Sequence, residues 1–100
     1  MPSTVSRLRL NPKASADLDG IFLDTAVRWS SEQADRYIAE IDDAMRALAR
    51  SPGLGQKVDD VRAGYYRYRA GSHLIFYRRV EPGIEVMRVL HQRMDIDRHL

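Results

Sequence analysis

The sequence predicts an α+β fold in which one strand comes first, an antiparallel pair of helices follows, and an antiparallel β-meander ends the chain. Two observations predict this order. Apolar residues recur at helical spacing between residues 12 and 50, and strand-forming residues separated by turns fill residues 61–91. A chain of 100 residues can bury one core, so residues 1–100 are expected to form a single domain.

The first strand and the first helix have clear local signals. Apolar and polar residues alternate from Val5 to Leu10, which predicts a half-buried strand paired with the meander. Asn11 and Pro12 predict a helix start, because asparagine caps free amides and proline tolerates the first helical position. The apolar stripe of this helix is expected to be core and contains Ala14, Leu18, Ile21, Phe22, Ala26 and Trp29. A weaker second stripe is expected to stay partly exposed, as a partner surface or as surplus hydrophobic surface, and contains Ala16, Gly20, Leu23 and Val27.

The second helix and the meander follow. Ser30 and Gln33 fit a capping box ahead of an apolar stripe that continues to Ala49, and Ser51-Pro52-Gly53 ends the helix. Residues 54–60 show no periodicity and predict a loop. Strand formers then occupy residues 65–70, 73–80 and 84–91, separated by turns at Gly71-Ser72 and Glu81-Pro82-Gly83.

Composition narrows the function classes. The chain has no cysteine, which excludes disulfides and thiolate metal sites and is typical of a reducing compartment, so we expect a cytoplasmic protein without a membrane segment or secretory signal. The net charge is only +2, but eight arginines lie between Arg62 and Arg98. Arginine binds carboxylates and phosphates, so this half of the chain favours an acidic partner or nucleic acid, unless it is only a solvated basic face.

The middle strand of the meander is apolar on both sides. Leu74 and Phe76 alternate with Ile75 and Tyr77, so both faces of this strand require cover. Two helices can cover one face of the sheet, and no other segment is long enough to be a second layer. We therefore expect an open second face that acts as a protein interface. The alternatives are that the C-terminal tail packs on it, or that its apolar residues simply stay exposed as scattered side chains.

Several short motifs together resemble a known family. They are Ala16-Asp17-Leu18, Trp29 with Gln33-Ala34 and Tyr37, Pro52-x-x-Gly55, Arg62-x-Gly64-Tyr65, Gly71-Ser72-His73, Ile75-Phe76-Tyr77-Arg78 and Leu90-His91-x-Arg93-Met94-Asp95. The combination resembles the ParE toxins of the RelE/ParE superfamily, from about Leu10 to Leu100. The resemblance implies the fold described above, a type II toxin–antitoxin pair with a ParD-like antitoxin in a hetero-oligomer, and DNA gyrase as the usual target that the free toxin poisons.

This resemblance assigns partners to two surfaces. The antitoxin is expected to be an acidic, amphipathic segment that folds on binding, with its carboxylates on the arginines. The expected antitoxin-binding residues are Leu23, Val27, Arg67, Arg69, Ile75, Tyr77 and Arg78. The expected target-binding residues lie in the C-terminal tail and are Arg93, Met94, Asp95, His99 and Leu100.

Two other functions remain as alternatives. A RelE-like ribosome-dependent mRNA endoribonuclease needs an acid/base, for which His91 is the one good candidate, with Arg67, Arg69 and Arg88 as phosphate ligands. The tail has no tyrosine after Arg93 and a lone lysine precedes the meander, so we expect no catalytic residues and no enzyme. The other alternative is a nucleic-acid-binding module, in which tyrosines interleaved with the arginines stack on bases.

No metal or cofactor is expected. His73 and His99 have no carboxylate or cysteine partners at metal-ligand spacing. The glycines at positions 53 and 55 lack the lysine and helix that a phosphate-binding loop requires.

Overall fold

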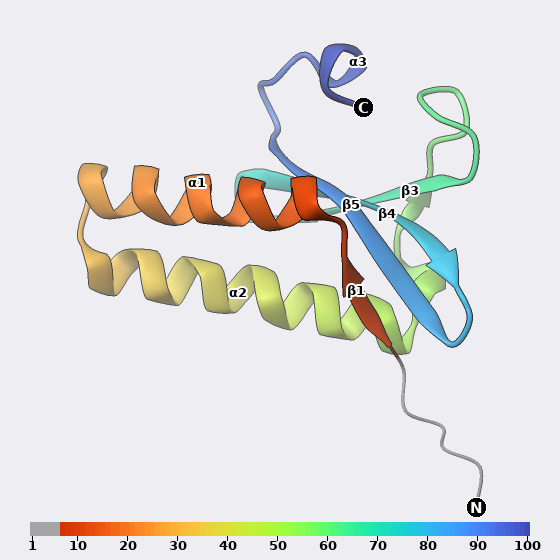
Figure 1. Cartoon of the computed structure of the whole chain (residues 1–100), viewed down its shortest axis with the longest axis horizontal. Coiled ribbons are helices and arrows are strands. Elements are labelled where there is room, and N and C mark those ends of the chain that lie inside the picture. The colour runs from red at the N-terminus through yellow and green to blue at the C-terminus, as the bar shows by residue number, and fades with distance from the viewer. Residues whose placement is uncertain (1–6) are drawn as a thin grey trace, which may run out of the picture.

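The computed structural model describes residues 7–100 as a two-helix hairpin, a five-stranded sheet and a short C-terminal helix (Figure 1). The helices are α1 (Pro12–Arg28), α2 (Ser31–Arg50) and α3 (Ile96–His99). The strands are β1 (Leu8–Leu10), β2 (Gln56–Lys57), β3 (Tyr65–Ala70), β4 (His73–Val80) and β5 (Gly83–His91). The predicted fold class is confirmed.

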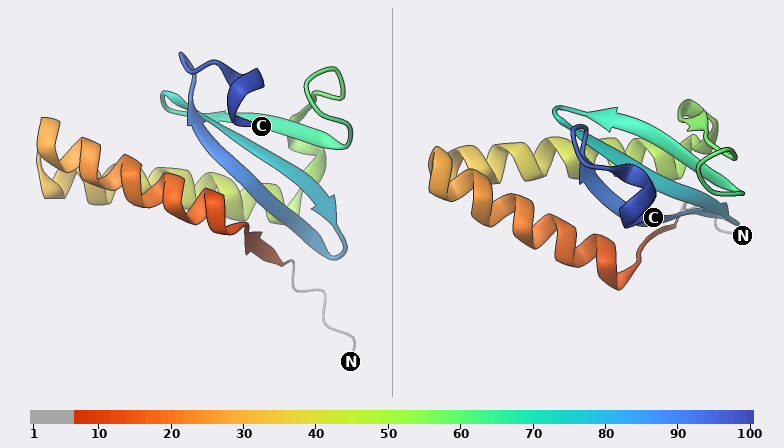
Figure 2. Two further views of the ribbon diagram at one scale, coloured as in Figure 1. Left: turned by 45° about the horizontal axis from the view of Figure 1, so that its top comes forward. Right: turned by 90° about the horizontal axis from the view of Figure 1, so that it is seen from above.

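Side-chain caps begin both long helices, as their sequences predict. The Asn11 side-chain oxygen accepts a hydrogen bond from the Lys13 amide at 2.9 Å, and the Ser30 hydroxyl accepts one from the Gln33 amide at 3.0 Å. Each cap satisfies an amide that has no partner inside its helix. The two helices then lie side by side and antiparallel (Figures 1 and 2).

The strands form one mixed sheet in the order β1-β5-β4-β3-β2. Strands β3, β4 and β5 are the predicted antiparallel meander. Strand β1 lies parallel to β5, with Leu8 opposite Ile84; positions 5 and 6 of the predicted first strand lie outside the described residues. The two-residue strand β2 lies in the segment that was predicted to be a loop, where it pairs with Tyr66 and Arg67.

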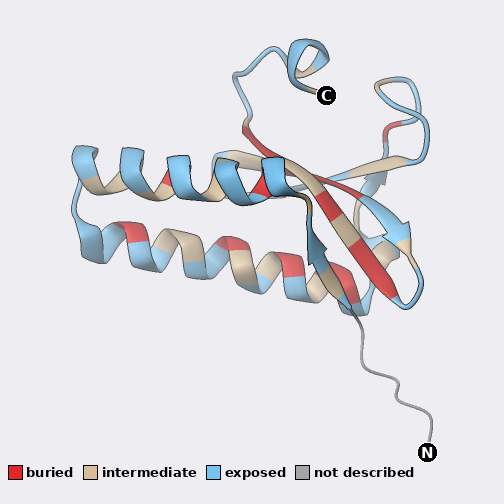
Figure 3. Ribbon diagram, in the orientation of Figure 1, coloured by how far each residue is buried: buried red, intermediate tan, exposed pale blue. Residues whose placement is uncertain are grey.

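The main core lies between the helix pair and one face of the sheet (Figure 3). Its fully buried side chains come from α2 and from the central strands; they include Ile41, Met45, Leu48, Ile75, Tyr77, Ile84 and Val86. Burying one large apolar side chain contributes about 1.5–3 kcal/mol, so this layer supplies most of the stabilising burial.

The second face of the sheet is covered as well, so the prediction of an open face is wrong. Phe76 and Leu90 are about 1% exposed and form a second cluster with Val58. Ile96 and Leu100 of the C-terminal segment pack on this cluster from outside. The two large side chains on this face, Phe76 and Leu90, present only a small apolar area. One loop and a four-residue helix are enough to cover that area. The alternative expectation, cover by the C-terminal tail, is the one that the structure shows.

Trp29 also differs from its prediction. It was expected in the core, but its side chain is 75% exposed. Helix α1 ends at Arg28, and the tip of the hairpin extends past the sheet, so no strand lies under this position (Figure 1).

Candidate functional site

Arg67, Arg69 and Arg78 share the sheet face that is turned away from the helices. The register of β3 and β4 places Arg67 opposite Phe76 and Arg69 opposite Leu74, and residues paired across strands share a face. Arg78 lies two residues beyond Phe76 on β4, and Phe76 belongs to the cluster on this second face. All three arginines are exposed. We call Arg67, Arg69 and Arg78 the arginine face.

The three arginines differ in their charge environment. Arg78 donates two hydrogen bonds to one Glu85 oxygen, at 2.9 and 3.1 Å. Arg67 is bonded to the neutral Gln56 side chain at 3.3 and 3.4 Å, and Arg69 to a backbone carbonyl at 2.9 Å. Within residues 7–100, no carboxylate lies within 4.0 Å of Arg67 or Arg69. These two guanidinium groups border a shallow hollow of about 470 Å³ and are suited to bind carboxylates or phosphates.

Ile75 and Tyr77 do not belong to this surface. Both have 0% exposure and lie in the core under the helices, so their assignment to an antitoxin-binding surface is wrong. The Tyr77 hydroxyl donates to the Pro52 carbonyl at 2.7 Å and accepts from the Gly55 amide at 2.9 Å; burial raises the pKa of Tyr77. Because β4 is apolar on both sides, its pattern did not indicate which side the helices would cover.

Helix α1 exposes an apolar stripe. Leu23 is 63% exposed and Val27 is 86% exposed, and Trp29 follows at the tip of the hairpin. The exposure that the sequence predicted for Leu23 and Val27 is therefore present. Exposed apolar side chains at successive turns of one helix are typical of a surface that packs against another protein.

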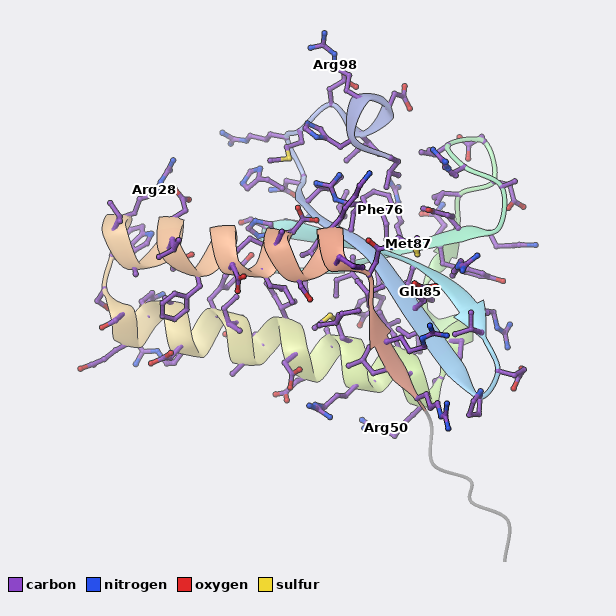
Figure 4. The ribbon with its side chains drawn as sticks, viewed as in Figure 1. Arg28, Arg50, Phe76, Glu85, Met87 and Arg98 are labelled. Carbon is purple, nitrogen blue, oxygen red and sulfur yellow. The ribbon has the colours of Figure 1, made fainter. Side chains whose placement is uncertain are left out.

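The C-terminal segment places the predicted target-binding residues on two sides. Its exposed members are Arg93, Met94, Asp95 and His99. Leu100 instead packs on the second cluster, where Arg62 donates a 2.7 Å hydrogen bond to its carbonyl oxygen. Figure 4 shows Arg98 of the same segment pointing away from the fold. This segment therefore covers the sheet with one side and presents polar groups with the other.

An ion pair ties α1 to β5 and to the C-terminal segment. The Arg88 guanidinium donates to both Asp17 carboxylate oxygens at 2.8 Å, and the Val89 amide donates to the same carboxylate at 2.9 Å. Arg88 also donates to the His99 carbonyl oxygen at 2.7 Å. The hydrogen bonds that Arg88 donates to Asp17 raise the pKa of Arg88. Arg88 is thus occupied by a carboxylate and is not a free phosphate ligand.

A groove of about 960 Å³ runs between α1 and the end of the sheet where β4 begins and β5 ends. We call it the histidine groove. Its lining residues include Ala16, Gly20, Trp29, His73, His91 and Met94. It opens on the opposite side of the sheet from the hollow beside Arg67 and Arg69.

The two histidines of this groove face each other across β4 and β5, with ring centroids 5.2 Å apart and an edge-to-face arrangement. His73 Nδ1 lies 2.6 Å from the Tyr37 hydroxyl, and His91 Nδ1 accepts a hydrogen bond from the Arg93 amide at 3.1 Å. Burial lowers the pKa of His73, and the nearby His91 lowers it further. Sequence reasoning missed this pair because it weighed each histidine alone.

The histidine pair depends on an irregularity of the sheet. Val80 pairs with Gly83, and an unbroken register from that turn would place Leu90 opposite His73. The register shifts between Phe76 and Tyr77, which leaves one extra residue on β5 and brings His91 opposite His73.

This geometry separates the residues that a ribonuclease would combine. His91 lies in the histidine groove on the helix side, Arg67 and Arg69 lie on the other face, and Arg88 is bound to Asp17. Cleavage of RNA needs the acid/base and the cations around one phosphate. The described residues do not bring the predicted set together.

Two further features of residues 7–100 concern membranes and metal ions. No helix in this range is long and apolar enough to cross a membrane. In the same range, no three histidine, cysteine, aspartate or glutamate side chains gather in a way that would hold a metal ion.

Known proteins resemble this chain over nearly all its length. A family model described as the ParE toxin of the type II toxin–antitoxin system, parDE, matches residues 8–96. The toxin ParE1 of Mycobacterium tuberculosis is 46% identical over 96 residues, covering 95% of this chain and 98% of that protein. The toxin ParE1 of Caulobacter vibrioides is 45% identical over 92 residues, covering 92% of this chain and 95% of that protein.

A solved structure shares the fold. A chain from the chromosomal ParDE toxin–antitoxin system of P. aeruginosa matches with a TM-score of 0.76 and 21% identity, covering 89% of this chain and 98% of that one. The strand, helix hairpin and meander described above are thus the fold of that chain too. The family match and the two relatives show that the chain belongs to the ParE toxin family of type II toxin–antitoxin systems.

Proposed function

We propose that a ParD-like antitoxin silences this toxin, and that the free toxin binds and poisons DNA gyrase without cutting RNA. The observation that carries the proposal is the separation of His91 from Arg67 and Arg69 on a ParE-type fold. The chain has exposed basic and apolar surfaces suited to hold proteins, and its described residues do not assemble a nuclease site around His91.

The antitoxin surface has a basic part and an apolar part. Arg67 and Arg69 offer guanidinium groups without carboxylate partners among the described residues, and Leu23 and Val27 offer exposed apolar side chains. An acidic, amphipathic segment that folds on binding has both kinds of complementary group. Arg78 contributes less in this proposal, because Glu85 already neutralises it.

The gyrase surface is assigned to the exposed side of the C-terminal segment, which carries Arg93, Met94, Asp95 and His99. Leu100 supports this segment from its buried side. Deleting the tail would also uncover Phe76 and Leu90, so loss of toxicity on truncation would not separate target binding from folding. Single exposed side chains give the sharper test.

The test uses purified toxin in three assays side by side. Gyrase supercoiling and DNA-cleavage assays should show inhibition and accumulated cleaved DNA, whereas ribosome-dependent cleavage of mRNA should be absent. Arg93→Glu and Met94→Asp should reduce the gyrase effect. Arg50→Glu is the matched control, because this exposed arginine lies at the far end of α2 (Figure 4).

Each remaining outcome contradicts part of the proposal. Cut mRNA with unaffected gyrase would replace it with the ribonuclease function. Tight binding of naked DNA with a steep salt dependence would favour a nucleic-acid-binding module. If the control Arg50→Glu lost gyrase inhibition as the tail variants do, the loss would not be specific to the tail. The gyrase surface could then not be assigned to the tail.

A further inference from the structure

We propose that the histidine groove is a docking site for an acidic helical segment of the antitoxin, and that His73, His91 and Arg93 at its end bind a carboxylate of that segment. This inference rests on the proposed antitoxin partner and assigns its site. The groove, the free positive charge at its end and the apolar residues beside it are the three observations that carry the inference.

The shape of the groove fits a helix. Its α1 wall extends from Ala16 to Arg28, thirteen residues that span about 18 Å at 1.5 Å per residue, the length of about three turns. Ala16 and Gly20 form part of this wall, and a side chain added at Gly20 would meet no atom within 4 Å. Small residues on the wall let a second helix approach closely.

The charge of the groove selects an acidic occupant. Its two carboxylates already have partners, since Asp17 binds Arg88 and Asp24 binds Arg28. Arg93 also lines the groove, and no carboxylate of residues 7–100 lies within 4.0 Å of its side chain. The free charge of the groove is therefore positive because of Arg93, and protonation of His73 would add to it.

The exposed apolar residues of α1 indicate that the segment bound in the groove is amphipathic. Leu23 and Val27 lie on the same stripe of α1 as Ala16 and Gly20, at helical spacings of three and four residues. Trp29 and Met94 also line the groove, and they are 75% and 45% exposed. A helix in the groove would cover these side chains with its apolar face and turn its carboxylates to the histidines.

His73 can take up a proton without losing its contact to Tyr37. In the protonated ring both nitrogens donate, so the Tyr37 hydroxyl oxygen becomes the acceptor at 2.6 Å. The Tyr37 proton then turns to the Ala70 carbonyl, 3.4 Å away. The ring thus has a route to the charged state when a carboxylate arrives.

The charges around His73 set its response to a partner. Burial and the facing His91 lower the pKa of His73, while the α1 carboxylates Asp24 and Asp17 raise it by less. A carboxylate bound beside the His73 ring favours its charged form, so binding should draw in protons and strengthen as the pH falls.

The test measures binding of the full chain to its ParD-like antitoxin by calorimetry at pH 7.5 and pH 6.0, in two buffers of different ionisation enthalpy. The wild-type chain should take up protons on binding, and its affinity should rise by about threefold to tenfold at pH 6.0, because one pKa unit corresponds to tenfold. The double variant His73→Gln, His91→Gln should lose most of this uptake. Thermal melting checks that it folds.

A second pair of variants leaves the histidines in place. Gly20→Glu and Gly20→Lys put side chains of similar length into the groove with opposite charge. At pH 6.0 the glutamate should weaken binding about tenfold more than the lysine, because it repels an acidic partner. Ala39→Glu adds the same charge on the exposed side of α2 and is the matched control.

The outcomes separate this inference from the proposed function. Two outcomes overturn the groove assignment alone. In one, the histidine variant binds the antitoxin and takes up as many protons as the wild-type chain. In the other, Gly20→Glu and Gly20→Lys weaken antitoxin binding equally. Absence of antitoxin binding at both pH values overturns both proposals. A dimer of the toxin that both Gly20 variants dissociate would make a second copy the occupant, and this also overturns the inference.

Discussion

His73 is the residue whose chemistry depends most on its neighbours. Its ring is half-buried between Tyr37 of α2 and His91 of β5, and this position disfavours its charged form. In the unfolded chain the same side chain is free to take up a proton near its ordinary pKa of about 6.5. Protonation of His73 is therefore less favourable in the folded chain than in the unfolded chain.

This difference predicts how stability varies with pH. Since the pKa of His73 is lower in the folded chain, the unfolded chain binds more protons below about pH 6.5, and the free energy of unfolding should fall as the pH drops from 7.5 to 5.0. His73→Gln should make this fall smaller. Urea unfolding at several pH values measures the effect, and parallel profiles for the two proteins would contradict it.

Gly71 is a second residue whose surroundings determine which side chain the position tolerates. Its φ is +59°, and an added Cβ would lie 2.6 Å from Tyr37 Cε1. Gly71→Ala should lower the free energy of unfolding by about 1–3 kcal/mol, because it meets both an unfavourable backbone and a fixed ring.

Gly53→Ala is the matched control for this change. An added Cβ at Gly53 meets nothing within 4 Å, and its φ is not positive. We expect it to change stability by less than about 0.5 kcal/mol. Denaturant unfolding compares the two variants, and equal effects would show that the close approach to Tyr37 has no cost.

The C-terminal element owes its structure to contacts outside itself. Helix α3 has four residues, which is far too short to be stable alone. Arg88 donates to the carbonyl oxygen of His99, and Arg62 donates to the oxygen of Leu100, which follows the helix. Ile96 packs over the second cluster. This element is thus at once a cover for the sheet and the carrier of the proposed gyrase surface.

Removing its apolar contact should uncover the sheet. Ile96→Ala should reduce the free energy of unfolding by about 1–2 kcal/mol and increase binding of a hydrophobic dye, because Phe76 and Leu90 lose part of their cover. Arg98→Ala alters an exposed side chain of the same helix and should do neither. Dye fluorescence unchanged in both variants would mean that the segment is not needed as cover.

The whole molecule separates its surfaces over opposite sides of the sheet. The arginine face lies on one side, and the histidine groove with the α1 stripe lies on the other. A partner that uses both must wrap around the edge of the fold. The charge of the arginine face then governs the association rate. Burial in the histidine groove and on the α1 stripe governs the dissociation rate.

The arginine face should therefore act mainly on the association rate. Replacing both Arg67 and Arg69 with alanine should slow association with the antitoxin several-fold and reduce its salt dependence, because these guanidinium groups attract an acidic segment before contact. Arg46→Ala is the control, since Arg46 is paired with Asp42 at 2.8 Å on α2. Stopped-flow rates that remain unchanged would remove the arginines from the antitoxin surface.

Local signals were enough to predict the secondary structure. The caps at Asn11 and Ser30 and the helical spacing of apolar residues predicted α1 and α2, and turn residues at positions 71 and 81–83 predicted the meander. These features depend on residues a few positions apart, which the sequence displays directly. The exposed residues Leu23 and Val27 of α1 followed from the same periodicity.

Contacts between distant residues decided the rest. Both sides of β4 are apolar, so only packing determined that Ile75 and Tyr77 face the helices while Phe76 faces the C-terminal segment. One extra residue in β5 brought His91 opposite His73, and the fold brought Asp17 to Arg88 across 71 positions. The sequence by itself determined the elements and their order. The tertiary structure determined the groove and the covered sheet, because register and layer choice depend on the free energy of the whole packed core.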